Sequence, residues 1–199
     1  DCIILCGGKG TRLKGALPDG TPKCLADING RTFLSILVDL IRTWGFERII
    51  LAVCHGSDLV RREVATWAKN DDILFSEDWG DGTWMAAHQA MRLTRGEVFC
   101  VVNGDTYFAR LDGMAMVQEV EKEVRTNISV LIGNEVNAEQ DKAGIRFIRR
   151  ANFGLPIVSL DSTLDTFPMR FELWDGEWSW IDIGTPKKLE EFREWQKKL

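Results

Sequence analysis

Strand-like and helix-like segments alternate through most of this chain of 199 residues. Short apolar runs at 2–6, 48–54 and 97–102 have the length of buried strands. Between them, apolar residues recur every three or four positions, as in 33–44, which is typical of helices packed on one side. The alternation predicts an α/β fold: one domain over 1–199, with a Rossmann-like mixed, mostly parallel sheet flanked by helices.

The same patterns predict the remaining elements. Further helices are expected at 59–68, 84–93, 114–124 and 186–199. Further strands are expected at 73–75, 127–132, 144–148 and 155–160. Residues 134–142 are predicted to form a loop, and 174–183 a hairpin or a packed loop. Right-handed crossovers place the carboxyl ends of parallel strands at one edge, so the loops that start at Gly7 and Asn103 should meet there.

Composition excludes several classes of function. The net charge of −5 argues against a nucleic-acid partner. No apolar run approaches the ~20 residues that a membrane helix needs, and no signal peptide is recognisable. The five cysteines form no Cys-x-x-Cys pair and four lie in apolar runs, which indicates buried free thiols in a reducing, cytoplasmic compartment. A homo-oligomer is compatible with the sequence.

A glycine-rich loop follows the first strand directly. Gly7, Gly8 and Gly10 allow a sharp turn in which backbone N–H groups approach an anion, and Lys9 and Arg12 add positive charge. The loop fits neither the P-loop pattern nor the dinucleotide fingerprint Gly-x-Gly-x-x-Gly. On these residues alone, a phosphate site and a plain basic turn both remain open.

The order of the motifs resembles the sugar-1-phosphate nucleotidyltransferases. Leu-Cys-Gly-Gly-Lys-Gly-Thr-Arg-Leu at 5–13 is followed by Pro-Lys-Cys-Leu at 22–25. Asn-Gly-Asp-Thr at 103–106 and Trp-Ile-Asp-Ile-Gly-Thr-Pro at 180–186 come later in the same order. Within that family, Val-Asn-Gly-Asp-Thr-Tyr-Phe at 102–108 is most similar to the D-glycero-D-manno-heptose 1-phosphate guanylyltransferases.

The resemblance implies an enzyme with a defined reaction. A sugar 1-phosphate, of the heptose or mannose type, would attack the α-phosphorus of a nucleoside triphosphate, expected to be GTP, and pyrophosphate would leave. By the same resemblance Arg12 holds the pyrophosphate, Lys23 neutralises the reacting phosphates, and Asp105 and Asp182 bind Mg²⁺. Taken singly, Lys23 fits a surface lysine, Asp105 a turn and Asp182 the approach to a helix.

The resemblance also implies how both substrates are held. The nucleotide would contact seven positions: Leu5, Gly7, Gly8, Gly10, Thr11, Gly82 and Thr83. Glu77 stands where relatives that use GTP have a glutamate able to accept the guanine N1–H and N2–H, although an exposed acid beside Asp78 explains it equally well. For the sugar, Gly104 and Asn152 are the candidates, the latter in an Asn-Phe-Gly at 152–154.

Two other functions are compatible with parts of this pattern. A nucleotide-sugar-dependent glycosyltransferase also has an acidic metal motif after a strand, but needs neither the glycine-rich loop nor the Pro-Lys pair. A non-catalytic, regulatory nucleotidyltransferase-like module would not need to retain the basic and acidic residues named above. Trp84-Met85, where the family has small residues, keeps the second alternative open.

Overall fold

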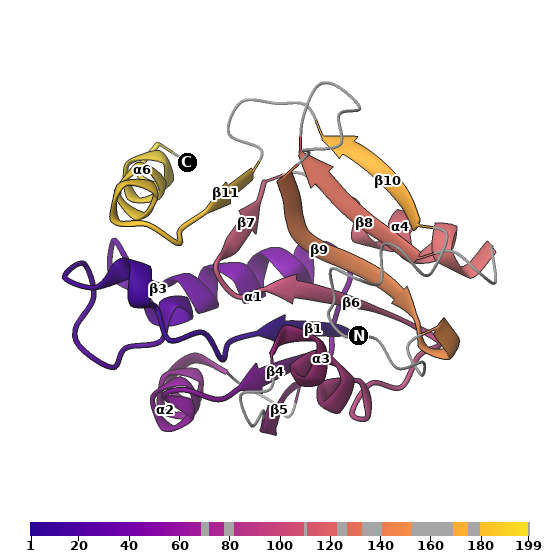
Figure 1. Cartoon of the computed structure of the whole chain (residues 1–199), viewed down its shortest axis with the longest axis horizontal. Helices are drawn as coiled ribbons and strands as arrows, with labels where there is room; N and C mark the ends of the chain where they lie inside the picture. The colour runs from indigo at the N-terminus through magenta and orange to yellow at the C-terminus, as the bar shows by residue number, and fades with distance from the viewer. Residues whose placement is uncertain are drawn as a thin grey trace.

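The computed structural model describes residues 1–68, 72–77, 82–109, 111–122, 127–132, 141–152, 169–174 and 180–198. Its main sheet contains seven strands in the order β10-β8-β9-β6-β1-β4-β5 (Figure 1). The strands are β1 Cys2–Leu5, β4 Ile49–Val53, β5 Ile73–Glu77, β6 Val98–Asn103, β8 Asn127–Ile132, β9 Asp141–Arg149 and β10 Met169–Trp174. The helices are α1 Phe33–Thr43, α2 Ser57–Trp67, α3 Thr83–Met91, α4 Gly113–Lys122 and α6 Pro186–Gln196.

The sheet is mixed and mostly parallel, as the alternation of segments predicts. β5, β4, β1 and β6 run parallel to one another, and β10 is parallel to β8. Only β9, which lies between β6 and β8, is antiparallel to both of its partners. Two short pairs complete the described strands: β2 Asp27–Ile28 with β3 Arg31–Thr32, and β7 Thr106–Phe108 with β11 Trp180–Asp182.

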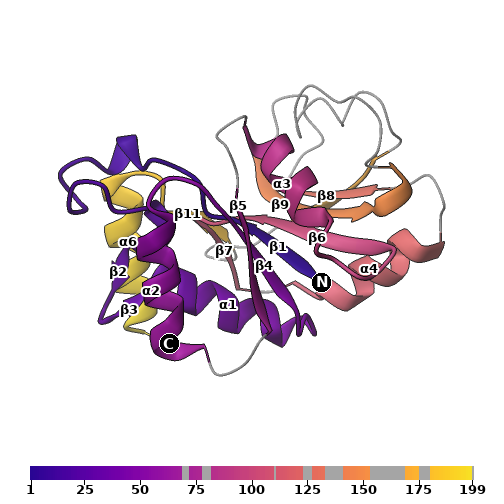
Figure 2. The same cartoon turned by 90° about the horizontal axis from the view of Figure 1, so that it is seen from below.

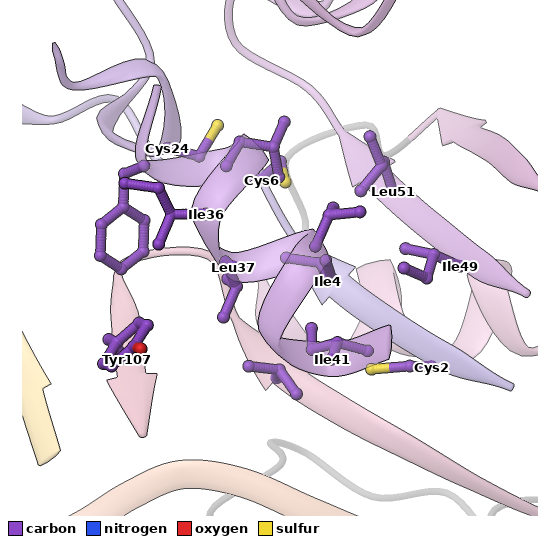
Figure 3. Close-up of a cluster of buried hydrophobic side chains, with 14 of the residues drawn as sticks. Cys2, Ile4, Cys6, Cys24, Ile36, Leu37, Ile41, Ile49, Leu51 and Tyr107 are labelled. Carbon is purple, nitrogen blue, oxygen red and sulfur yellow. The ribbon is translucent and has the colours of Figure 1, made fainter. Parts of the chain in front are cut away.

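Helices cover both faces of the sheet, and each face has its own apolar core (Figure 2). On one face, α1 and α4 pack on the larger core; Figure 3 shows Ile36, Leu37 and Ile41 of α1 against side chains of β1 and β4. On the other face, Trp84 and the alanines of α3 pack on Ile3, Ile50, Phe99 and Val101. Because successive strand residues alternate between faces, β1, β4 and β6 each contribute side chains to both cores.

Local sequence signals set the ends of the helices. Thr32 precedes α1 and its side chain accepts a hydrogen bond from the Ser35 amide at 3.4 Å, while Gly45, with φ of 90°, follows its end. Thr185 caps α6 in the same manner, accepting from Lys188 at 3.3 Å, and Pro186 occupies the first helical turn. Within the described ranges no helix is long and apolar enough to cross a bilayer.

Most predicted elements are confirmed, with shifts of a few residues at their ends. A hairpin at 174–183 is wrong: Trp174 ends β10, which pairs with β8, whereas Trp180 begins β11, which pairs with β7. The predicted loop at 134–142 is too long, because Asp141 already belongs to β9. The strand predicted at 155–160 lies outside the described residues.

Candidate active site

A cavity of about 360 Å³ lies at the carboxyl ends of β1, β4 and β6. The register places Leu5 beside Ala52 on one side and Asn103 on the other, so the loops after these strands open at the same edge. Five of the predicted nucleotide contacts line this cavity: Leu5, Gly7, Gly8, Gly82 and Thr83. Lys23, Gly104 and Asp105 line it as well, so the expected meeting of the two loops is confirmed.

The cavity combines close backbone contacts with a helix N-terminus. Gly104 donates its N–H to the Leu5 carbonyl at 3.0 Å, and a Cβ at Gly104 would lie 2.6 Å from that oxygen. Only glycine therefore fits this contact between β1 and the loop after β6. Gly82 and Thr83 start α3, whose first N–H groups have no acceptors within the helix, and such an end favours anions.

The second half of the glycine-rich loop turns away from this cavity. Gly10, with φ of 67°, precedes the short 3-10 helix η1 Thr11–Leu13. Gly10 and Thr11 line a neighbouring hollow of about 170 Å³, and Lys9 borders both hollows. A Cβ at Gly10 would lie 3.2 Å from Cγ of Lys23, so the loop packs directly against the predicted catalytic lysine.

Lys23 and Asp105 form an ion pair inside the cavity. Lys23 Nζ lies 2.8 Å from Asp105 Oδ2, and the two side chains are only 17% and 19% exposed. Lys23 begins the 3-10 helix η2 Lys23–Leu25, after Pro22. Pro22 packs on Gly56, whose φ is +66° and where a Cβ would lie 2.6 Å from the Pro22 ring. The turn after β4 thereby supports the backbone that presents Lys23.

The pairing of β7 with β11 brings the backbone segments that carry the two predicted metal ligands side by side. Asp182 is the cross-strand partner of Thr106, and the Ile183 amide donates to the Asp105 carbonyl at 2.9 Å. Asp182 Oδ1 accepts from the Gly184 amide at 2.5 Å. A Cβ at Gly184 would lie 3.1 Å from Nη2 of Arg12, so the Arg12 guanidinium lies beside Gly184, two residues after Asp182.

The donor set fits a hard divalent cation. Among the described residues, no group of three or more His, Cys, Asp or Glu side chains is placed to bind a metal. The two aspartates offer carboxylate oxygens, the ligands that Mg²⁺ prefers, and a site with two protein ligands leaves positions for water and phosphate oxygens. The cysteines nearby do not alter this, because they are soft ligands.

Three cysteines also line the cavity, and sequence reasoning gave them no role there. All five cysteines are free, and Cys2, Cys6 and Cys100 are buried as their apolar runs predict; Cys24 is buried as well, whereas Cys54 is only partly buried. The pKa of the Cys6 thiol is raised. The larger cause is its hydrogen bond with the Cys24 thiol, and the second is its burial. Because a raised pKa keeps Cys6 as a thiol, we assign it to packing rather than to nucleophilic chemistry.

Two predicted contacts lie away from the cavity. Glu77 ends β5 at the correct edge, but its carboxylate pairs with Arg61 of α2, and the guanidinium of Arg61 also stacks on Phe75. Asn152 belongs to the 3-10 helix η3 Arg150–Asn152, which starts where Arg149 pairs with Val98, at the amino end of β6. That is the opposite edge of the sheet, so Asn152 leaves the proposed site.

Asn103 lines the cavity, although its motif suggested no separate role for it. The side chain lies against Gly144 of β9, where a Cβ would be 2.6 Å from Nδ2 of Asn103. The predicted strand begins at Gly144, so the sequence contains no signal for this contact; the structure places the glycine inside β9, where an isolated glycine is typical of a bulge or a close approach.

Residues 2–130 match the protein family described as the MobA-like NTP transferase domain. The D-glycero-alpha-D-manno-heptose 1-phosphate guanylyltransferase of Campylobacter jejuni is 35% identical over 107 residues, or 53% of this chain and 48% of that protein. The bifunctional protein GlmU of Pseudomonas paraeruginosa is 35% identical over 115 residues, or 56% of this chain and 23% of that protein. The matches thus span about half or less of these relatives.

Solved structures show the same fold over nearly the whole chain. HddC from Yersinia pseudotuberculosis superposes with a TM-score of 0.79 at 23% identity, covering 98% of this chain and 99% of HddC. It has also been solved in complex with GMP-PN. A putative glucose-1-phosphate thymidylyltransferase from Bacillus anthracis superposes with a TM-score of 0.78 at 17% identity, covering 100% and 96% of the two chains.

Proposed function

The chain belongs to the MobA-like NTP transferase domain family, and from this premise we propose that it joins a nucleoside triphosphate to a sugar 1-phosphate. The pair of Lys23 with Asp105 is the observation that supports this most directly, because it sets a cation and a carboxylate 2.8 Å apart in the cavity beside the glycine-rich loop. Asp182 lies on β11 opposite Thr106, the residue after Asp105, and Arg12 lies beside Gly184. These residues match the needs of phosphoryl chemistry, in which positioning and neutralisation of charge dominate.

The reaction follows from placing both substrates in this cavity. An oxygen of the sugar phosphate forms a bond to the α-phosphorus, while the bond from that phosphorus to the oxygen bridging to the β-phosphorus breaks. Backbone N–H groups of Gly7 and Gly8 and the start of α3 face the triphosphate. Phosphate oxygens compete with Asp105 for the ammonium of Lys23, and Arg12 stabilises the charge that leaves with pyrophosphate.

We propose Mg²⁺ as the metal, held by Asp105 and Asp182. When bound, the ion supplies positive charge at the phosphate oxygens and orients them. Within this proposal the Lys23 ammonium orients the Asp105 carboxylate before the substrates arrive.

GTP and a heptose- or mannose-type sugar 1-phosphate are the proposed substrates. The names of the Campylobacter jejuni relative and of the HddC complex point to guanine nucleotides for those proteins. If Glu77 binds guanine here, its carboxylate has to leave Arg61 and turn toward the base. That exchange is a specific requirement of the guanine proposal.

The cellular setting follows from the cysteines and the charge. Five free thiols support a reducing compartment, and we propose the cytoplasm. A net charge of −5 supports small anions held in one basic loop, and not nucleic acid, as the partners. A single domain and a homo-oligomer stay predictions.

The test is pyrophosphate release with a panel of nucleoside triphosphates and sugar 1-phosphates. We expect release only when GTP and mannose 1-phosphate or a heptose 1-phosphate are both present. Sugar transfer from a nucleotide-sugar, without pyrophosphate release from any pair, would favour a glycosyltransferase. Nucleotide binding with no turnover of either kind would favour a regulatory module.

A further inference from the structure

Residues of different chemistry line the cavity. Gly82, Thr83 and Ala86 line its α3 end, the region expected to hold the nucleotide. Asn103, the last residue of β6, lines its β6 end and pairs in register with Leu5 of β1, which lines the cavity as well. The side chain of Asn103 is an uncharged carboxamide, with two donor hydrogens and one acceptor oxygen.

The backbone of β9 is shaped around this carboxamide. Ile145 pairs with Val102, which leaves Gly144 opposite Asn103. Gly144 has φ of +76°, and a Cβ there would lie 2.6 Å from Nδ2 and 3.0 Å from Cγ of Asn103. The register of β9 against β8 also shifts between Ser129 and Leu131, beside the same position. Such bulges next to a site change the direction of side chains.

We infer that Asn103 binds a hydroxyl group of the sugar 1-phosphate and that Gly144 is its positioning residue. The inference rests on the proposed function, because it assigns the β6 end of the cavity to the sugar. A carboxamide suits a sugar hydroxyl, since both partners donate and accept hydrogen bonds. Asp105 comes two residues after Asn103 and is paired with Lys23. The phosphate of the same substrate then lies toward this pair, which lines the same cavity.

Gly144 acts through Asn103 alone in this inference. A methyl group at 144 would force the carboxamide to move, because 2.6 Å is shorter than any ordinary contact of a Cβ with nitrogen. Shortening Asn103 to alanine removes both Nδ2 and Cγ, the two atoms closest to that methyl group. The two substitutions should therefore not add in their effect on sugar binding, since each removes the same interaction.

Four variants of the full chain test this: Asn103→Ala, Gly144→Ala, the double variant, and Gly45→Ala as the matched control. Gly45 also has a left-handed backbone, with φ of +90°, and a Cβ there would lie 2.7 Å from Cγ of Met114. It follows α1, away from the cavity. It therefore reproduces the backbone strain of Gly144→Ala without touching Asn103.

The measurements are the KM for mannose 1-phosphate, kcat, the Kd of GTP by titration, and the melting temperature. Asn103→Ala should raise KM about tenfold, as expected for one lost hydrogen bond to substrate, and leave the Kd of GTP within about twofold. Gly144→Ala should raise KM by a similar factor, and the double variant no further. Gly45→Ala should lower the melting temperature as Gly144→Ala does and leave KM unchanged.

Three results would overturn the inference: an unchanged KM in Asn103→Ala, a loss of GTP affinity as large as the loss for the sugar, or a raised KM in Gly45→Ala. Failure of the proposed function looks different, because the parent itself would then release no pyrophosphate. In that case direct titration of mannose 1-phosphate into the parent and into Asn103→Ala decides. Equal binding, or none to the parent, would refute the assignment of Asn103.

Discussion

Replacing Lys23 by alanine separates a catalytic cation from a structural ion pair. The ammonium lies 2.8 Å from Asp105 Oδ2, and the two side chains are 17% and 19% exposed. Loss of the ammonium leaves the Asp105 carboxylate largely buried without its cation. The variant should therefore be less stable as well as slower.

The size of both effects follows from this geometry. At 2.8 Å and an effective dielectric constant of about 20, the gross attraction is about 6 kcal/mol, and desolvation of both groups cancels much of it. Because the pair borders a cavity open to water, we expect the free energy of unfolding to fall by about 1–3 kcal/mol. Loss of a charge-assisted hydrogen bond in the transition state should lower kcat about tenfold to hundredfold.

The assay combines urea unfolding, steady-state kinetics and titration of GTP. Lys23→Ala should lower kcat strongly and nucleotide affinity less, because the lysine serves the reacting phosphates. Lys122→Ala is the matched control, since it breaks a lysine–carboxylate pair with Glu119 at 3.3 Å in which Lys122 is 69% exposed. That exposed pair should contribute at most about 1 kcal/mol and leave kcat unchanged.

Lys23→Arg tells the two roles apart. Arginine keeps a positive charge beside Asp105 and should restore much of the stability, but its planar head differs from a compact ammonium and should not restore kcat. If Lys23→Ala lost stability yet kept the kcat of the parent, the lysine would be structural only. The proposed chemistry would then lose its central residue.

The other predictions concern the remaining parts of the site. Asp105→Asn and Asp182→Asn should each abolish turnover, because each replaces a charged ligand by a neutral one. Circular dichroism should show that the fold is kept. If a variant kept full activity and still required Mg²⁺, that residue would not belong to the metal site. Glu77→Gln should weaken a preference for GTP over other triphosphates, with a loss of about 1–3 kcal/mol in the free energy of GTP binding. Arg61→Ala should strengthen GTP binding, because it frees the Glu77 carboxylate. A parent protein that prefers another base would refute both predictions. Arg12→Ala should lower both kcat and nucleotide affinity, and parent-like values by kinetics and titration would make the basic loop ordinary surface.

Local patterns in the sequence predict the frame of this site well. The strand ending at Leu5 and the glycines after it, and the strand ending at Asn103 and the turn after it, are read from consecutive residues. The rule for parallel strands then brings both loops to one edge. The resemblance names Lys23 and Asp105 as site residues, but their direct contact, between positions 82 residues apart, is seen only in the structure.

Pairings between distant short strands are harder to predict. β7 and β11 have three residues each, too few for a periodic pattern, yet their register sets Asp182 beside the residue after Asp105. The family resemblance predicted both ligands without any indication of how the chain joins them. Asn152 shows the opposite case: a three-residue likeness suggests a sugar contact, but the position of Asn152 beyond the amino end of β6 could not be predicted, because nothing local reveals that β9 returns antiparallel along β6.

Glu77 shows how far the alternation of side chains along a strand can predict a binding residue. It gives the face of β5 from which the Glu77 side chain starts, but not the group that its carboxylate contacts. Alternation places Phe75 and Glu77 on one face of β5 and Leu74 on the other. Arg61 of α2 contacts both Phe75 and Glu77, whereas Leu74 and Leu5 both pack on the core beneath α3. The cavity is lined by Leu5 and Ala86, so it opens on the α3 face, and Glu77 starts from the wrong face of its strand. Only its place at the end of β5 allows the Glu77 side chain to turn toward the base. Guanine recognition by Glu77 therefore requires the base to compete with Arg61 for the Glu77 carboxylate.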